Sequence, residues 1–350
     1  MDEITQDLFN KKKSISINDI AKYAGVSKST VSRILNDKGK FSEDTREKVL
    51  RVVKKLNYSP SMVARSLRNR RTKTVGLLLP NIANPFFPAI LKGVECVASE
   101  NGYVVVLCDS DERKEKESLY FQIFENRWVD GIIFSGITGD EEEQKYIRTI
   151  HEKGTPVVLI DREIEGYFTN VVMIDNKRAA FDATTHLLEL GHKKIGHIAG
   201  LQNIKVFVKR LEGYKEALAE YGIDFDPKLM EEGDLSIESG SCAVRQLLKK
   251  KVTFTAIFVG TDLMAIGCMK ELQKNGLRVP QDVSIVGFDN IPLASLVTPS
   301  LTTVAQPTYE IGAEAMNLLI KSIEKKGALK SKIILPTELV IRESAGPPKG

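Results

Sequence analysis

Cysteine is scarce in this sequence, whose 350 residues include only Cys96, Cys108, Cys242 and Cys268. These residues lie far apart in apolar or helical stretches and form no Cys-x-x-Cys pair, which favours buried free thiols in a reducing compartment over disulfides. Long hydrophobic runs are also missing, so no segment is predicted to span a membrane. The polar residues 1–14 lack the hydrophobic region of an export signal, and we expect a disordered leader on a cytoplasmic protein.

Several catalytic and cofactor motifs are missing as well. No Gly-x-Gly-x-x-Gly follows a strand-like run and no Gly-x-x-x-x-Gly-Lys-Ser/Thr loop occurs, so a nucleotide cofactor has no cradle. The four histidines lack the His-x-x-x-His spacing of a metal site, and no Gly-x-Ser-x-Gly marks a hydrolase nucleophile. The sequence therefore predicts no cofactor, no metal and no catalytic residues, and we do not expect an enzyme.

Positive charge is concentrated at the start of the chain. Residues 1–73 hold 18 lysines and arginines against 8 acidic residues, whereas the remainder holds 32 against 38. A basic module suits contact with phosphates, because neutralising them releases counterions and adds affinity without regard to sequence. The length predicts about two or three compact units, of which the basic one is expected to meet nucleic acid.

Residues 15–58 show the apolar spacing of three short helices. The stripes are Ile17, Ile20, Ala21 and Ala24 in the first, Val31, Ile34 and Leu35 in the second, and Val49, Val52, Val53 and Leu56 in the third. Ser16 or Asn18 can cap the first helix, which Gly25 ends, while Ser27 and Ser42 can cap the other two. Two short helices joined by a Gly-containing turn are the outline of a helix-turn-helix, and the three stripes can close one small core.

The exposed face of the second helix is predicted to contact double-stranded DNA. Side chains near the start of a recognition helix reach base edges in the major groove, and arginine suits bidentate contact with guanine. We assign base contact to Lys28, Ser29 and Arg33. Positions nearer the phosphates are assigned to Ser27, Thr30, Ser32 and Asn36. The alternative is an ordinary solvated polar face, which the three-helix pattern and the local basic excess disfavour.

From residue 74 onward, apolar strand-like runs alternate with helical periods. The runs lie at 75–80, 103–108, 131–135, 157–161, 195–199, 255–259 and 283–288. Continuous Val, Ile and Leu runs between helices indicate α/β architecture, with parallel sheets covered on both faces. Because the same rhythm occurs twice, we expect two lobes of one design.

Polar side chains follow these runs, where open parallel sheets bind their ligands. The residues are Asn84, Phe86, Phe87, Asp161, Arg162, Arg210, Thr261, Asp262, Asp289, Asn290 and Gln306. Carboxylates, guanidinium groups and amides beside paired phenylalanines suit a polyhydroxylated ring, so a small polar effector is predicted. Taken singly, each has a structural alternative: Asn84 opens an Asn-Pro turn, Asp161 and Asp289 can cap strand ends, and Arg210 can be a solvated helix residue.

Four segments of the head occur in the order SerIleAsnAspIleAla, ValSerLysSerThrValSerArg, AsnTyrSerProSer and ValAlaArgSerLeu. This arrangement resembles the LacI/GalR (lactose-repressor) family of bacterial transcription regulators, and the similarity runs from Ser16 to about Ser344. The resemblance implies a hinge helix and linker at 59–73 that order on operator DNA as a dimer, with Leu67, near Ala64, wedging into the minor groove. The alternative for Leu67 is simple hinge packing.

The resemblance also implies the fold: an all-α helix-turn-helix headpiece at 15–58 and a two-lobed, doubly wound, periplasmic-binding-protein-like domain at 74–345. Lobe 1 is expected at about 74–162 and 291–322, and lobe 2 at about 163–290 and 323–345. The effector set is similar to that of ribose-type sugar-binding proteins at Asn84, Phe86, Phe87, Asp161, Arg162, Arg210, Asp289 and Gln306. Leu235 stands where an aromatic is common and Thr261 where ribose binders have asparagine, which leaves the sugar open.

The sequence thus predicts a transcriptional repressor that binds a near-palindromic operator as a homodimer, because one helix-turn-helix reads only a half-site. A sugar or sugar derivative between the lobes is expected to control it, as inducer or as co-repressor. One alternative is a global carbon regulator controlled by a phosphocarrier protein. A sugar-binding transport protein fits less well, since it has no use for Lys28 or Arg33. No heptad run follows Ile341, which favours a dimer over a tetramer.

Overall fold

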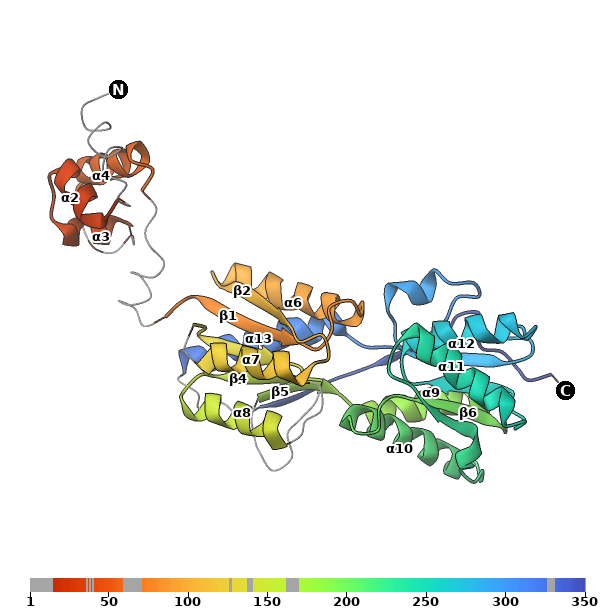
Figure 1. The fold of residues 1–350 in the computed structure, drawn as a ribbon. Helices are drawn as coiled ribbons and strands as arrows, with labels where there is room; N and C mark the ends of the chain where they lie inside the picture. The colour runs from red at the N-terminus through yellow and green to blue at the C-terminus, as the bar shows by residue number, and fades with distance from the viewer. Residues whose placement is uncertain are drawn as a thin grey trace. The chain divides into compact units, whose positions relative to one another are not determined.

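The computed structural model describes residues 15–35, 37, 39, 41–58, 71–125, 128–136, 141–161, 170–325 and 331–349. The chain divides into two compact units, Met1–Thr72 and Lys73–Gly350, which we call the headpiece and the body (Figure 1). The predicted site residues Asn36, Ala64, Leu67 and Arg162 lie outside the described residues. The predicted leader and most of the predicted hinge helix lie outside them too.

The headpiece contains the three predicted helices: α2 (Ile17–Ala24), α3 (Lys28–Leu35) and α4 (Glu43–Lys55). Their stripes meet in one core that includes Ile20, Ala24, Val31, Ile34 and Val49. Gly25 ends α2 in the left-handed conformation, with φ of 65°, which glycine adopts without strain. Ser42 caps α4, because its hydroxyl accepts a hydrogen bond from the Thr45 N–H at 3.3 Å. The predicted helix-turn-helix is confirmed.

The first sheet of the body, which defines lobe 1, is parallel throughout, in the order β11-β5-β4-β3-β1-β2. Its strands are β1 (Thr74–Leu79), β2 (Val104–Asp109), β3 (Gly131–Phe134), β4 (Val157–Ile160), β5 (Asn170–Ile174) and β11 (Lys332–Leu335). One face packs on α6 (Phe86–Glu100) and α13 (Thr308–Glu324), and the other on α7 (Lys114–Glu125) and α8 (Glu141–Glu152) (Figure 1). Successive residues of β1 alternate between the two cores: Leu77 and Leu79 join the first, and Leu78 the second.

The second sheet, which defines lobe 2, has the order β12-β10-β9-β8-β6-β7, with only β12 antiparallel to its neighbour. Its strands are β6 (Ile195–Ala199), β7 (Met230–Glu232), β8 (Ala256–Val259), β9 (Ser284–Asp289), β10 (Thr302–Ala305) and β12 (Glu338–Val340). The helix pair α9 (Asn176–Glu189) and α10 (Lys205–Glu220) covers one face, and α11 (Ile237–Lys249) with α12 (Asp262–Lys274) covers the other. Two similar lobes of doubly wound type are therefore confirmed.

The lobe limits differ from the prediction at three strands. β5, expected in lobe 2, pairs with β4 of lobe 1, and β11, also expected in lobe 2, pairs with β5. β10, expected in lobe 1, pairs with β9 of lobe 2. The chain crosses between the lobes after β5, after β10 and after β11. These crossings carry no compositional signal because they are very short: a single residue, Asp175, separates β5 from α9.

The four cysteines are free, but they are not all buried as expected. Cys108 and Cys268 are buried, Cys96 is half-buried, and Cys242 is exposed on α11. Cys242 is exposed because it lies off the buried face of α11, which is formed by Gly240, Ala243, Val244 and Leu247. Among the described residues, no helix combines the length and the apolar character that crossing a bilayer requires.

Candidate DNA-binding face and effector pocket

The start of α3 presents most of the predicted DNA-reading residues to solvent. Lys28, Ser29 and Arg33 are exposed. Ser27 caps the helix, because its hydroxyl accepts a hydrogen bond from the Thr30 N–H at 3.1 Å. The same hydroxyl lies 2.7 Å from the Ser29 hydroxyl and 2.8 Å from the Thr30 hydroxyl. This cluster of hydroxyl groups at a helix N-terminus is suited to a phosphate oxygen, and its contact with DNA stays a prediction.

Ser32 does not belong to this face. Its side chain is 5% exposed, although we predicted that it points outward toward the phosphates. The reason is that α3 packs against both α2 and α4, so the turn that follows Val31 is covered on two sides. A short hydroxyl side chain fits such a position where a longer polar one would not. The predicted outward orientation of Ser32 is therefore wrong, while its assignment to phosphate contact stays a prediction.

The body holds a pocket between its lobes, at the carboxyl ends of the strands of both sheets. It is lined by Pro80, Asn84, Phe86, Phe87, Glu112, Ser135, Asp161, Leu201, Ile204, Val206, Phe207, Arg210, Leu235, Thr261, Asp289 and Gln306. The described residues predicted to bind the effector are all among them except Asp262 and Asn290. Asn290 Oδ1 instead accepts a hydrogen bond from Arg342 Nη2 at 2.7 Å. The cavity volume of about 80 Å³ is far below the roughly 300–1,000 Å³ that drug-sized ligands occupy, so only a small ligand fits.

Arg210 is the central cation of the pocket. It projects from α10, its guanidinium Nε donates to Asn176 Oδ1 at 2.8 Å, and Nη1 donates to the Gly260 carbonyl at 2.6 Å. The group lies 3.6 Å from the centroid of the Phe288 ring, which is a stacking distance. These contacts fix the plane of the guanidinium. A solvated helix position, our alternative for Arg210, is therefore ruled out.

Asp289 lies beside this cation at the end of β9. Asp289 Oδ1 is 3.7 Å from Arg210 Nη1, too far for a hydrogen bond, and both side chains are buried. Burial raises the pKa of the Asp289 carboxyl to about 7, and Asp161 adds to the rise, while Arg210 and Gln306 oppose it. Burial also lowers the pKa of Arg210, which stays charged at neutral pH because a guanidinium is essentially always protonated. The site thus keeps a fixed cation next to a carboxyl group that can take up a proton.

Three buried oxygen atoms of the pocket have no hydrogen-bond partner among the described residues: Asp161 Oδ1, Gln306 Oε1 and Ser135 Oγ. Buried polar groups are nearly always paired, and leaving one unpaired costs roughly 1–3 kcal/mol. A ligand with several hydroxyl groups would supply the missing donors. The pocket is therefore expected to bind a ligand that offers several hydrogen-bond donors.

The backbone around the pocket is unusual. Four of the lining residues have positive φ without being glycine: Glu112 at 55°, Asp161 at 69°, Leu235 at 76° and Asp289 at 119°. Such conformations cost of order 1–3 kcal/mol each and gather where a site demands a particular direction of the side chain. These positions bring three carboxylates and one leucine to the lining of the same cavity.

A layer beneath the pocket supports this geometry. The Asp262 carboxylate is fully buried and accepts hydrogen bonds from Thr303 Oγ1 at 2.6 Å and from the Ile291 N–H at 2.9 Å. Burial raises its pKa well above the usual range, and the nearby Asp289 charge adds to the rise. Thr261 caps α12, because its hydroxyl accepts from the Met264 N–H. Asp262 therefore joins the segment after β9 to the start of β10. Thr261 caps α12 and also lines the pocket.

Sequence reasoning missed several lining residues. Ser135 directly follows β3, and Glu112 comes shortly after β2, so the strand-end rule could have found both if applied to every strand. Phe207, Ile204 and Leu201 lie between β6 and the first turn of α10 and were hidden by their apolar character, which is typical of core residues. The pocket is thus more apolar on its lobe 2 side than the sequence suggested.

A headpiece of helix-turn-helix type joined to a two-lobed ligand-binding body defines a DNA-binding transcription regulator. A family model of bacterial regulatory proteins of the lacI family matches residues 16–61, and one of the periplasmic binding protein-like domain matches residues 184–345. The ribose operon repressor of Halalkalibacterium halodurans is 43% identical over 331 residues, which is 94% of this chain and 96% of that protein. The chain belongs to the LacI family, whose members are transcriptional repressors and not enzymes.

Solved structures agree with this assignment. The lac repressor dimer bound to operator and the anti-inducer ONPF has a TM-score of 0.86 at 28% identity, covering 95% of this chain and 100% of that one. A LacI family transcriptional regulator from Enterococcus faecium with bound ribose has a TM-score of 0.70 at 30% identity, covering 79% of this chain and 100% of that one. Both the fold and the pairing of a DNA-binding region with a ligand-binding domain are therefore shared with known repressors.

Proposed function

We propose that this repressor binds a near-palindromic operator in the cytoplasm as a homodimer and that a neutral sugar of the ribose class, bound in the pocket, controls it. The main support for a sugar ligand is a set of acceptor atoms without partners around the fixed Arg210 donor. These atoms are Asp161 Oδ1, Gln306 Oε1 and Ser135 Oγ. A monosaccharide, which carries several hydroxyl groups on one small ring, supplies these donors. The ribose operon repressor and the ribose-bound relative support the same sugar class.

The charges of the pocket favour a neutral sugar over a sugar phosphate or sugar acid. Glu112, Asp161 and Asp289 line it together with Arg210, so the described carboxyl groups outnumber the described cation. An anionic ligand placed there would face these carboxylates in a poorly hydrated site, where like charges repel strongly. An uncharged ring avoids that cost and can still accept from Arg210.

Dimerisation is supported in lobe 1 by an apolar edge. β2 is the last strand on its side of the sheet, and Val104, Val106 and Leu107 on it are exposed. Leu119 and Ile123 of α7 are exposed as well. An uncovered apolar edge strand readily pairs with another chain, so a stable protein is expected to cover it.

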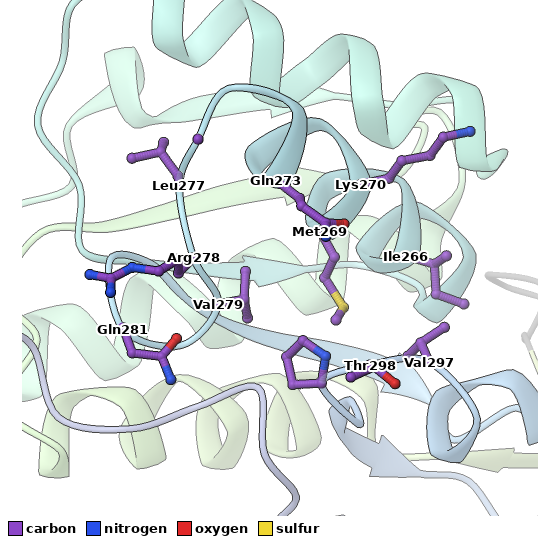
Figure 2. A pocket seen from close by; sticks show the side chains of 12 residues that line it. Ile266, Met269, Lys270, Gln273, Leu277, Arg278, Val279, Gln281, Val297 and Thr298 are labelled. Atoms are coloured by element: carbon purple, nitrogen blue, oxygen red, sulfur yellow. The ribbon is translucent and has the colours of Figure 1, made fainter.

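Lobe 2 offers a second surface of this kind. Ile266 and Met269 of α12 line one side of a surface groove of about 550 Å³, and Val297 and Thr298 line the other (Figure 2). Leu296, next to this groove, is 74% exposed. With self-association through both lobes, a change in the arrangement of the lobes would alter the spacing of the two headpieces of a dimer. Effector and operator would then change each other's affinity by the same factor.

The sugar is tested by isothermal titration calorimetry on the full chain. We expect D-ribose to bind, and ribose 5-phosphate and adenine to bind far more weakly or not at all. Binding of adenine alone would contradict a sugar effector, and tighter binding of ribose 5-phosphate would contradict the charge argument. A change in operator binding that requires a phosphocarrier protein and ignores every sugar would favour the alternative of a global carbon regulator.

A further inference from the structure

Among the described residues, Phe207 provides the aromatic ring in the lobe 2 wall of the pocket. This residue lies in the first turn of α10 and packs with Leu201, Ile204, Val206 and Leu235 in a small apolar cluster separate from the main cores. Phe86 and Phe87 of lobe 1 line the same pocket, with their rings in edge contact at 5.1 Å. Aromatic rings therefore enter the pocket from both lobes.

The backbone near Phe207 makes room for its ring. A Cβ on Gly200, at the end of β6, would collide with Cγ, Cδ1 and Cε1 of Phe207. Leu235, on the other side of the cluster, holds a left-handed φ of 76°, which a leucine rarely adopts. The backbone on two sides of Phe207 thus fits the position of its ring.

Phe207 also touches the main donor of the pocket. The Arg210 guanidinium lies 5.1 Å from the Phe207 ring centroid and 3.6 Å from that of Phe288. The cation thus lies near one core ring and one pocket ring. A ligand that accepts a hydrogen bond from Arg210 must lie next to the Phe207 ring.

We propose that Phe207 is a specificity-determining residue of this repressor, which presents its ring to the apolar C–H face of a cyclic sugar and so selects rings over open-chain polyols. The proposal rests on the sugar effector argued above and names the part of the pocket that recognises ring form. A furanose or pyranose has a compact face of C–H groups that packs on an aromatic ring, whereas an open-chain polyol with the same hydroxyl groups has no fixed face of this kind.

The test compares D-ribose with its open-chain counterpart ribitol by calorimetry on the full chain. Phe207→Leu keeps an apolar side chain and removes the ring. We expect the variant to bind ribose about 3- to 10-fold more weakly, since contacts of an aromatic ring are worth about 0.5–1.5 kcal/mol. Its affinity for ribitol should change less than twofold. The ratio of the two affinities therefore separates ring recognition from a general loss of packing.

Two further variants serve as controls for the role of the Phe207 ring. Phe254→Leu changes a buried phenylalanine of lobe 2 outside the pocket, and it should leave the ribose-to-ribitol ratio unchanged. Phe207→Leu combined with Leu235→Phe returns a ring to the same wall and should restore part of the ratio. Equal ratios in the wild type and Phe207→Leu would overturn the proposal while leaving the sugar effector intact. A wild type that binds neither compound would overturn the sugar effector itself and this proposal with it.

Discussion

Gln306 Nε2 donates a hydrogen bond of 2.8 Å to Asp289 Oδ1 and so joins the residue at the end of β9 to the residue after β10. The bond fixes which end of the amide faces the carboxylate. As a consequence the other end, Gln306 Oε1, is buried without a partner among the described residues. One short bond between two strand ends thus leaves an oriented acceptor for a ligand.

Removal of the Asp289 carboxylate is expected to abolish the response to the sugar. Asp289→Ala takes away an acceptor and the partner of Gln306, and hydrogen bonds that involve charged groups are worth about 1.5–3 kcal/mol, or roughly 10- to 150-fold in affinity. Calorimetry with D-ribose checks this. The control is Asp224→Ala, an exposed aspartate of lobe 2 outside the pocket, which should bind as the wild type does. Unchanged ribose affinity in Asp289→Ala would place the sugar elsewhere.

The raised pKa of Asp289 predicts a pH dependence of stability with a definite sign. An unfolded aspartate titrates near pH ~4, whereas Asp289 titrates at about 7 in the folded body. Between these values the folded state holds a proton that the unfolded state lacks, so stability falls as pH rises toward and through 7. Asp289→Asn cannot ionise and lacks this slope.

Thermal unfolding of both proteins from pH 5 to pH 8 measures the effect. The wild-type midpoint should fall relative to that of Asp289→Asn as pH rises. Burial lowers the pKa of His197 to about 4, and this gives the opposite slope on the acid side in both proteins, so it cancels in the difference. A difference that is flat across this range would show that Asp289 titrates normally.

Arg33 is predicted to read a base. It is exposed on α3 and not required for the headpiece core. Arg33→Ala should weaken operator binding by about 1–3 kcal/mol and relax preference at one base pair. Arg33→Lys is the charge-matched control, since it keeps the phosphate attraction and loses the bidentate geometry. Binding titrations on operator and on random duplexes separate the two effects. Equal loss on both duplexes would make Arg33 a phosphate contact.

The dimer surfaces predict that charge placed on them separates the protomers. Val106→Glu puts a carboxylate on the β2 edge, and Leu296→Glu puts one beside the α12 groove. Light scattering should report a dimer for the wild type and a shift toward monomer for each variant. Tyr221→Glu is a control at an exposed aromatic of lobe 2 outside both surfaces. A dimer that survives both changes would place the interface on another part of the body.

Much of the fold follows from local patterns in the sequence. The headpiece helices begin and end near Ser16, Gly25, Ser27 and Ser42, as capping chemistry predicts. The strands of the body are continuous apolar runs, which alternate with helices as in other parallel sheets. The lobe limits were not predictable in this way, because membership of a sheet depends on pairing between distant strands, and β10 and β11 look like any other short strand.

In the pocket, too, local sequence patterns reveal some residues, while others become apparent only in the folded chain. Asp161, Asp289 and Gln306 were found because polar residues at strand ends stand out against apolar runs. Phe207 was not, since an apolar residue in a helix is most often part of a core, and only its position in the folded body shows that it lines the cavity. The outward orientation predicted for Ser32 was wrong for the opposite reason. Helical periodicity alone places this polar residue on the exposed face, but packing of α3 on two helices buries it.

One small ligand in the pocket is expected to change the affinity of the headpiece for DNA. Fluorescence anisotropy measures it most directly, with the full chain titrated onto a duplex that it selects from a random pool, with and without saturating D-ribose. We predict that ribose shifts operator affinity at least 5-fold in the wild type and not at all in Asp289→Ala, in line with coupling free energies of about 1–3 kcal/mol. Identical operator affinity in the wild type with and without bound ribose would contradict the account.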